Sequence, residues 1–417
     1  MTTRFLALSA LLFAACGGEE GEKKAKVEAC EVPGNICIWS GVAQTAMFSP
    51  EGQHRLDSPM YLPQGVSFGA DGTPYFPDFN NHRIRQVLDD GMVYTVSGTG
   101  MLGDGPIGSP GCYAPTPCDA LNSAWNHPTD VAVDPNDPDV VWVAAWHNSR
   151  IIRLDLEAGT LEWFAGTGGR QYGGDGGPAV DAVLDLPSSL AFDERTGLLY
   201  FSDQANHLIR RINADGTIET IAGTPRSPGF SGDGGPALEA KIHGHTDQKA
   251  DPGSKIIIDD GILYLADTVN GVIRAIDIDA GTIDTVVGSY SSAGDTELID
   301  ADGNPYLVDA GSITGYSGDG GPATEAVFNT PRDIAMSPDG NTMYIADTKN
   351  DCVRAVDMPS GTVDTFAGTC GVPGFAGDEG PAAEAMLSQP FGISVDPDGH
   401  VYIADALNQV IRRVAVE

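Results

Sequence analysis

Two histidines and an aspartate at alternate positions are the residues of this chain best suited to bind a metal ion. They are His243, His245 and Asp247. The H-x-H spacing would place both imidazoles on one side of an extended strand. Imidazole nitrogen with carboxylate oxygen is a ligand set that zinc and other transition metals accept. An exposed polar loop would have the same composition, so both interpretations stay open.

Aspartates in a repeated glycine-rich loop are the second set of candidate ligands. The loop reads Gly-Asp-Gly-Gly-Pro-Ala three times and Gly-Asp-Glu-Gly-Pro-Ala once, with its aspartates at Asp175, Asp233, Asp319 and Asp378. It lacks the lysine and the strand–loop–helix setting of a phosphate-binding loop. We therefore interpret it as a turn between repeats, with a bound cation as the alternative. No nucleophile elbow, triad spacing or dinucleotide fingerprint is present.

One pattern, D-x-x-N-x-x-[I/V]-R, recurs five times along the chain. Its acid and base are Asp78 and Arg85, Asp203 and Arg210, Asp267 and Arg274, Asp347 and Arg354, and Asp405 and Arg412. A sixth copy has Ala145 and Ile152 instead, so both charges are lost together. Asp and Asn bond their own backbone in turns, so the motif predicts a hairpin turn with a structural ion pair. The Arg could reach its own turn or the neighbouring repeat.

Each motif belongs to a unit of four short apolar runs, which predicts four strands. The middle of strand one is a small residue in five copies: Ser67, Ala132, Ala191, Ala335 and Ser394. Strand two carries an aromatic in all six: Tyr75, Trp142, Tyr200, Tyr264, Tyr344 and Tyr402. Small residues suit strands crowded around an axis, and the aromatics suit packing between sheets.

The last repeat stops after its third strand, and the missing strand is found at the other end of the chain. Residues 36–41 (ICIWSG) and 49–52 (SPEG) follow the order of strand four and the loop in complete repeats. We expect this segment to complete the last repeat, which closes a ring and leaves no open edge.

The turn motif, the strand that ends in a small residue and Gly, and the GDGGPA loop together resemble NHL repeats of the bacterial secreted type. The resemblance covers residues 36–417 and implies an all-β, six-bladed β-propeller. It implies no single activity, because NHL propellers include protein-binding modules, RNA-binding modules and a lyase class.

In propellers the connection into strand one opens at one end of the central channel. Asp130 and Asp333 occupy that position in the second and fifth repeats, which face each other across the ring. These carboxylates could hold a cation such as calcium, contact a polar ligand, or be solvated turn residues. We expect His127 and Arg332 beside them. An insertion at 289–315, with an acidic stretch at 300–304, is a further candidate contact surface.

The net charge of −35 argues against nucleic acid and anionic membrane surfaces as partners. Residues 1–15 have the features of a signal peptide and end at Cys16 in a sequence that resembles the bacterial lipobox. Residues 16–30 suit a flexible tether, and 31–417 the propeller. We therefore expect a lipid-anchored envelope protein that touches the membrane only through its anchor.

Six cysteines remain after Cys16, an even number for an oxidising compartment. Local spacing favours three pairs: Cys30–Cys37, Cys112–Cys118 and Cys352–Cys370. We expect a monomeric binding or interaction scaffold that contacts a protein, small-molecule or glycan ligand through the channel mouth and inserted loops. The alternative is a metal-dependent lyase or hydrolase with its site at the mouth.

Overall fold

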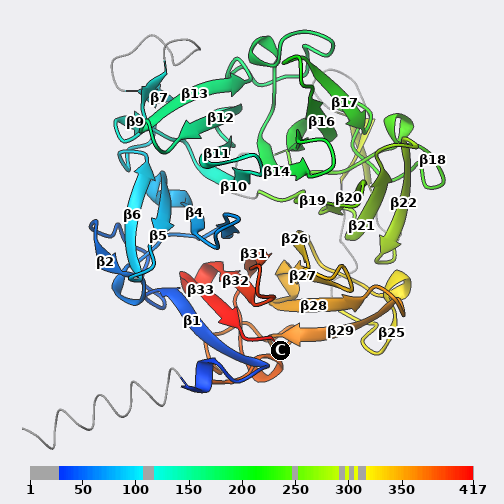
Figure 1. Cartoon of the computed structure of the whole chain (residues 1–417). Coiled ribbons are helices and arrows are strands. Elements are labelled where there is room, and N and C mark those ends of the chain that lie inside the picture. Colours follow the sequence, from blue (N-terminus) through cyan, green and yellow to red (C-terminus); the bar gives the residue numbers. More distant parts are fainter. Residues whose placement is uncertain are drawn as a thin grey trace, which may run out of the picture.

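The computed structural model describes residues 28–106, 117–246, 252–290, 296–299, 305–308 and 316–416. Six antiparallel sheets form a ring around a central axis (Figure 1). The first strands of all six sheets lie innermost and line the axial channel. The chain is therefore the all-β, six-bladed propeller that the repeats predict.

Each of the first three sheets, or blades, has four main strands. Blade one contains β3 (Ser67–Phe68), β4 (Pro74–Asp78), β5 (Arg83–Val87) and β6 (Met92–Ser97), with β2 (Gln53–His54) outside. Blade two contains β10 (Pro128–Asp134), β11 (Asp137–Ala145), β12 (Arg150–Asp155) and β13 (Thr160–Ala165), with β8 (Cys118–Asp119) outside. Blade three contains β14 (Pro187–Asp193), β15 (Leu198–Asp203), β16 (Leu208–Ile212) and β17 (Ile218–Ala222).

The other three blades repeat this order. Blade four contains β19 (Ile256–Asp259), β20 (Ile262–Asp267), β21 (Val272–Asp277) and β22 (Thr282–Val287), with β18 (Gly235–Pro236) outside. Blade five contains β26 (Pro331–Met336), β27 (Thr342–Asp347), β28 (Cys352–Asp357) and β29 (Thr362–Ala367), with β25 (Gly321–Pro322) outside. Blade six contains β31 (Pro390–Val395), β32 (Val401–Asp405), β33 (Val410–Val414) and β1 (Asn35–Gly41), with β30 (Gly380–Pro381) outside.

The N-terminal strand closes the ring, as predicted. β1 pairs antiparallel with β33 from Ile36 opposite Val414 to Gly41 opposite Val410. This pairing gives blade six its fourth strand, so neither end of the ring presents an unpaired edge. Figure 1 shows β1, at the blue end of the chain, beside the red β33.

Short 3-10 helices occur at two places in the repeat. The D-x-x-N turns form η2 (Phe79–Asn81), η4 (Gln204–Asn206), η7 (Thr348–Asn350) and η9 (Ala406–Asn408). The loops before the blades form η1 (Arg55–Asp57), η3 (Ala179–Asp181), η5 (Ala237–Glu239), η6 (Ala323–Glu325) and η8 (Ala382–Glu384). No helix in the described parts of the chain is long and apolar enough to cross a membrane.

The core lies between neighbouring blades. Five of the strand-two aromatics are buried, namely Tyr75, Trp142, Tyr200, Tyr344 and Tyr402, whereas Tyr264 is partly exposed. Trp142, for example, meets Phe164 of its own blade edge-on, with ring centroids 4.5 Å apart, and also packs against Phe192 of blade three. The aromatics are therefore packing residues, as expected.

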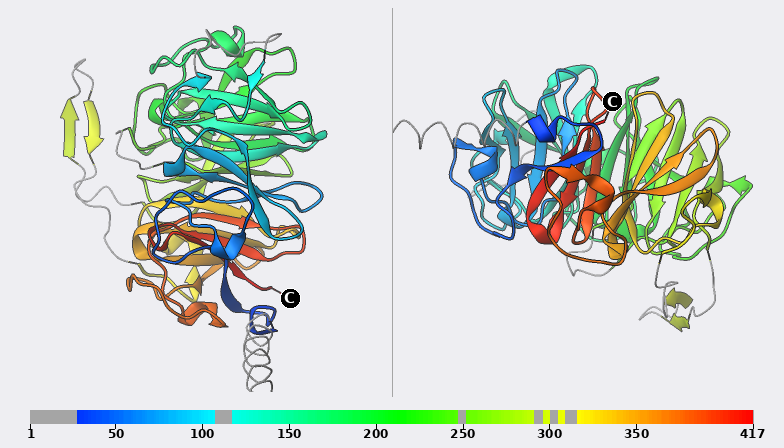
Figure 2. Two further views of the ribbon diagram at one scale, coloured as in Figure 1. Left: turned by 90° about the vertical axis from the view of Figure 1, so that its left-hand side faces the viewer. Right: turned by 90° about the horizontal axis from the view of Figure 1, so that it is seen from below.

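Two of the predicted disulfides, Cys30–Cys37 and Cys352–Cys370, are formed. Cys118 is also disulfide-bonded, while Cys112 lies outside the described residues. So do Cys16, the signal segment, most of the tether, Asp247 and the acidic stretch at 300–304. Within the long insertion, β23 (Thr296–Ile299) and β24 (Pro305–Val308) pair as a hairpin that stands apart from the ring (Figure 2). A small ribbon joins β7 (Gly105–Pro106) to β9 (Ser123–Ala124).

Candidate functional site

The D-x-x-N motif ties each turn to the loop that enters its own blade. In blade three, Asp203 accepts a hydrogen bond from the amide of Asp185 (2.7 Å) and another from the side chain of Asn206 (2.9 Å). Arg210 is the third partner, with 3.2 Å between Nη1 and the carboxylate. Both charged groups are fully buried. Burial raises the pKa of Asp203 to about 6, although the nearby Arg210 acts to lower it.

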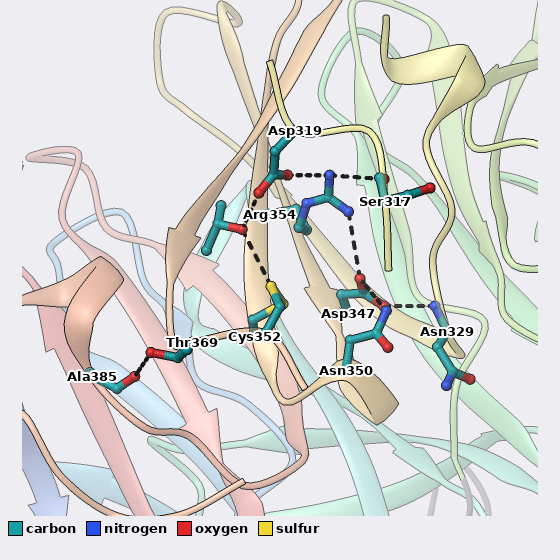
Figure 3. The surroundings of a disulfide bond; sticks show 11 residues. Ser317, Asp319, Asn329, Asp347, Asn350, Cys352, Arg354, Thr369 and Ala385 are labelled. Carbon is teal, nitrogen blue, oxygen red and sulfur yellow. Dashed lines mark hydrogen bonds and ion pairs between the residues drawn. A yellow bond between two sulfur atoms is a disulfide. The ribbon is translucent and has the colours of Figure 1, made fainter. Parts of the chain in front are cut away.

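Each motif arginine binds two carboxylates, the turn aspartate and the aspartate of the glycine-rich loop. Arg210 lies 2.5 Å from Asp175 as well as near Asp203. The same arrangement joins Arg274 to Asp267 and Asp233, Arg354 to Asp347 and Asp319, and Arg412 to Asp405 and Asp378. Figure 3 shows Arg354 between its two carboxylates, beside Cys352. The loop aspartates thus take part in structural ion pairs within one blade.

Blade one varies this pattern. Arg83 is the tighter partner of Asp78, at 3.0 Å, while the predicted partner Arg85 lies 3.8 Å away. Glu51 takes the place of the loop aspartate and faces both arginines.

Blade two replaces the missing aspartate with its asparagine. Asn148 Oδ1 accepts the amide of Asn126 at 2.9 Å, which is the bond that the turn aspartate accepts in other blades. Arg150 pairs with Asp104 and lies over the ring of Trp163, 3.8 Å from its centroid. Arg150 therefore takes the place of the arginine lost at Ile152, whereas a neutral amide oxygen takes the place of the carboxylate lost at Ala145.

The residue after the motif asparagine links one blade to the next, which sequence reasoning missed. It has a positive φ in every copy with a side chain. Its side chain accepts the amide of the residue before the next proline in three blades: His82 from His127, Asp351 from Gln389, and Gln409 from Leu62. A recurring polar residue at this position was the available signal.

The two predicted mouth carboxylates also join blades. Asp130 accepts the amide of Leu190 in blade three at 2.8 Å, and Asp333 accepts the amide of Ile393 in blade six at 3.0 Å. Both are buried. Ser189 makes the equivalent bond to the amide of Ile256, at 3.1 Å. These side chains therefore fasten the first strands around the axis.

Lys255 lies beside Asp130 at the same end of the channel, and sequence reasoning did not identify it. It directly precedes β19, as Asp130 and Asp333 directly precede the apolar core of their first strands. Its ammonium group lies 2.8 Å from Oδ1 of Asp130. Burial and the nearby Asp130 raise the pKa of Asp333 to about 7, while Lys255 acts to lower it. The insertion before blade four interrupts the alignment of the repeats, so the sequence did not show that Lys255 occupies the position of Asp130 and Asp333.

The cavity between these charges is small. Asp130, Lys255, Arg332 and Asp333 all line it, and its volume is about 30 Å³. That volume has room for about two water molecules. Arg332 is buried against the ring of Phe391 (4.0 Å to the centroid), and burial lowers its pKa to about 9. The structure thus brings Arg332 and both aspartates together at this end of the channel, in a space too small for an organic ligand.

His127 lies away from this cavity. Its Nδ1 is 2.9 Å from Nδ1 of His147, and its ring packs edge-on against His82. Burial is the main cause that lowers the pKa of His127 and of His147 to about 4. The cluster joins blades one and two and does not contact Asp130.

His243 and His245 also take part in blade packing. The amide of His243 donates to Asp267, and the carbonyl of His245 accepts from Gln204 at 2.8 Å. The ring of His243 meets His207 edge-on, with centroids 5.6 Å apart. Across the described residues, no three His, Cys, Asp or Glu side chains are grouped so that they could hold a metal ion. The third candidate ligand, Asp247, lies outside the described residues, so the metal site at His243, His245 and Asp247 stays a prediction.

The other end of the channel is wide. A funnel of about 700 Å³ opens there, lined by the first strands of all six blades. Its wall includes the predicted small residues Ser67, Ala132, Ala191, Ala335 and Ser394, together with larger apolar residues such as Phe68, Phe192 and Met336. Lys255 lies at its floor, and Arg195, Asp259 and Asp260 lie at its edge. The wall therefore combines apolar side chains with polar and charged ones, which suits a ligand that has both kinds of group.

No protein-family model matches the chain. NHL repeat-containing protein 2 of Bos taurus is 27% identical over 339 residues, which cover 74% of this chain and 41% of that protein. The chloroplastic Protein SUPPRESSOR OF QUENCHING 1 of Arabidopsis thaliana is 26% identical over 299 residues, which cover 70% of this chain and 25% of that protein. The chain therefore spans less than half the length of these relatives.

Two solved structures from Bacteroides thetaiotaomicron show the same fold. A protein of unknown function has a TM-score of 0.59 at 20% identity, over 92% of this chain and 76% of that one. An auxiliary nutrient binding protein has a TM-score of 0.57 at 17% identity, over 91% and 75%. The repeat motif, the closed six-bladed ring and the similarity to NHL repeat-containing proteins together support an NHL-repeat β-propeller.

Proposed function

We propose that the protein is a binding scaffold whose ligand or partner enters the wide axial funnel. The observation that carries this proposal is the difference between the two ends of the channel. The funnel measures about 700 Å³, while the charged end measures about 30 Å³. Ligand pockets usually measure about 300–1,000 Å³. The charged residues at the narrow end then serve as a plug that closes the floor of the funnel.

The funnel wall indicates the chemistry of the ligand. Val133, Phe192 and Ile258 are partly exposed and lie in inner strands of three consecutive blades. Charged side chains line the same pocket, among them Glu194, Arg195 and Lys255. A small molecule with an apolar body and polar substituents matches this mixture. The nutrient-binding role in the name of one structural neighbour is compatible with such a ligand.

Binding of a neutral apolar probe tests the proposal. Fluorescence titration with N-phenylnaphthylamine should show binding that weakens about fivefold or more in Ala191→Leu, because the larger side chain narrows the funnel. Leu238→Ser is the matched control, since Leu238 is 57% exposed and lies outside the funnel. Equal affinity in wild type and Ala191→Leu would contradict the proposal.

We also propose that the scaffold is tethered to a bacterial envelope through Cys16. The signal-like residues 1–15 and the disulfides of the propeller support an oxidising location. Metabolic labelling with a palmitate analogue should modify the wild-type protein and leave Cys16→Ser unlabelled. Unlabelled wild-type protein in the soluble fraction would refute the tether while leaving the funnel proposal intact.

A further inference from the structure

Blade one breaks the repeat at the start of its loop helix. Four of the loop helices begin with a buried alanine that follows a proline: Ala179, Ala237, Ala323 and Ala382. The helix η1 begins instead with Arg55, preceded by His54. Because four repeats fold with a small apolar residue here, the propeller itself does not require an arginine. The internal repeats thus act as a control for what the fold needs.

Arg55 is placed beside an aromatic ring and has hydrogen-bonding capacity to spare. Its Nη1 donates to the carbonyl of Trp39, and its guanidinium lies 5.4 Å from the centroid of the Trp39 ring. Among the described residues no carboxylate forms an ion pair with it. Burial lowers the pKa of Arg55. A guanidinium carries five N–H donors, so several remain for another acceptor.

Arg55 and His54 line a groove of about 560 Å³ between blades one and six. Three aromatic rings form its wall: Tyr402 lies 5.2 Å from Trp39 and 4.8 Å from Phe68, measured between centroids. Five carboxylates also line the groove, namely Asp71, Asp89, Asp90, Asp396 and Asp398. The groove is separate from the axial funnel except for Phe68, which borders both.

The mixture of groups selects the class of ligand. Five carboxylates would repel an anion. A simple cation would be attracted by them, but it would leave the N–H donors of Arg55 without an acceptor. A neutral ring with many hydroxyl groups satisfies both sets, because each hydroxyl donates to a carboxylate and accepts from a guanidinium. Its carbon-bound hydrogens would contact the aromatic wall. We infer that this groove binds a neutral carbohydrate, with Arg55 as a hydrogen-bond donor to it.

Saturation-transfer NMR with the intact mature chain tests this inference. The probes are maltose, cellobiose, lactose and N,N′-diacetylchitobiose, with glucuronate and spermidine as charged comparisons. At least one disaccharide should bind, and Arg55→Ala should weaken it about tenfold. This variant restores the residue that four other repeats carry, so it should fold. Trp39→Phe should also fold, since Phe164 and Phe366 pair with the strand-two aromatic in two other blades. It should weaken binding as well, because the smaller ring reduces the aromatic wall.

Ala191→Leu distinguishes the groove from the funnel. Disaccharide binding should be unchanged in Ala191→Leu, because Ala191 lines the funnel and does not line the groove. Loss of disaccharide binding in Ala191→Leu together with full binding in Arg55→Ala would overturn the inference and place the sugar in the funnel. Binding of none of the four disaccharides would also overturn it, as would selective binding of glucuronate or spermidine.

Discussion

The ammonium nitrogen of Lys255 lies 2.8 Å from Oδ1 of Asp130 at the narrow end of the axial channel. Asp333 contributes a second buried carboxylate at the same cavity. Both aspartates accept amide hydrogen bonds from the next blade, so their positions are fixed by the ring. Lys255 offsets part of this buried negative charge at the axis.

Replacement of Lys255 by Met should therefore destabilise the propeller by about 2 kcal/mol or more, because it leaves buried carboxylate charge without its cation. The double variant Asp130→Asn with Lys255→Met should recover part of this loss. Denaturant unfolding monitored by fluorescence measures both. A Lys255→Met variant as stable as the wild type would show that the ion pair contributes nothing.

Replacement of a motif arginine should destabilise the propeller more than replacement of Lys255. Arg210→Met removes the cation between Asp203 and Asp175 and should destabilise by about 3–5 kcal/mol, because Asp203 is fully buried. Arg153→Met is the control, since Arg153 is partly exposed and its carboxylate contacts are 3.8 Å long. That change should stay within about 1 kcal/mol. Thermal unfolding of the two variants compares them, and equal losses would contradict the motif's structural role.

The repeats made the ring predictable, because a pattern that recurs at a constant spacing indicates that each copy folds into the same four-stranded unit. The pairing of Asp203 with Arg210 followed from their joint absence in blade two. The third member, Asp175, is 35 residues from Arg210. The loop lies against strand three only in the folded blade. The sequence alone therefore could not exclude that the loop aspartates bind a cation.

The candidate sites were less predictable for two physical reasons. Lys255 follows an insertion that interrupts the repeat, so alignment by the proline did not reach it. The groove at Arg55 is made from opposite ends of the chain, since Trp39 belongs to β1 and Tyr402 to β32. The sequence predicted that the ring closes, but it did not indicate that this closure brings Trp39 and Tyr402 together in a possible binding site.

His207 should make stability depend on pH. It is buried against His243, and burial lowers its pKa to about 3. Between about pH 6.5 and pH 3 the unfolded chain therefore binds a proton that the folded chain does not, so stability falls as pH falls. His207→Asn cannot titrate, and Asn tolerates the left-handed backbone there. The stability advantage of wild type over variant should shrink by about 2.7 kcal/mol between about pH 7.5 and pH 4.5. Parallel stability curves for the two proteins would exclude this role.

Two glycines at the narrow end of the channel should respond differently to the same substitution. A Cβ on Gly392 would lie 1.8 Å from the carbonyl oxygen of Gln64, whereas a Cβ on Gly65 would lie 3.9 Å from its nearest neighbour, Oδ2 of Asp333. The carbonyl cannot move without shifting the first strand of blade one. Gly392→Ala should therefore destabilise by about 3 kcal/mol, while Gly65→Ala should stay within about 0.5 kcal/mol. Chemical denaturation of both variants provides the comparison. Similar midpoints for the two would mean that blades one and six are not packed against each other at the axis as the structure has them.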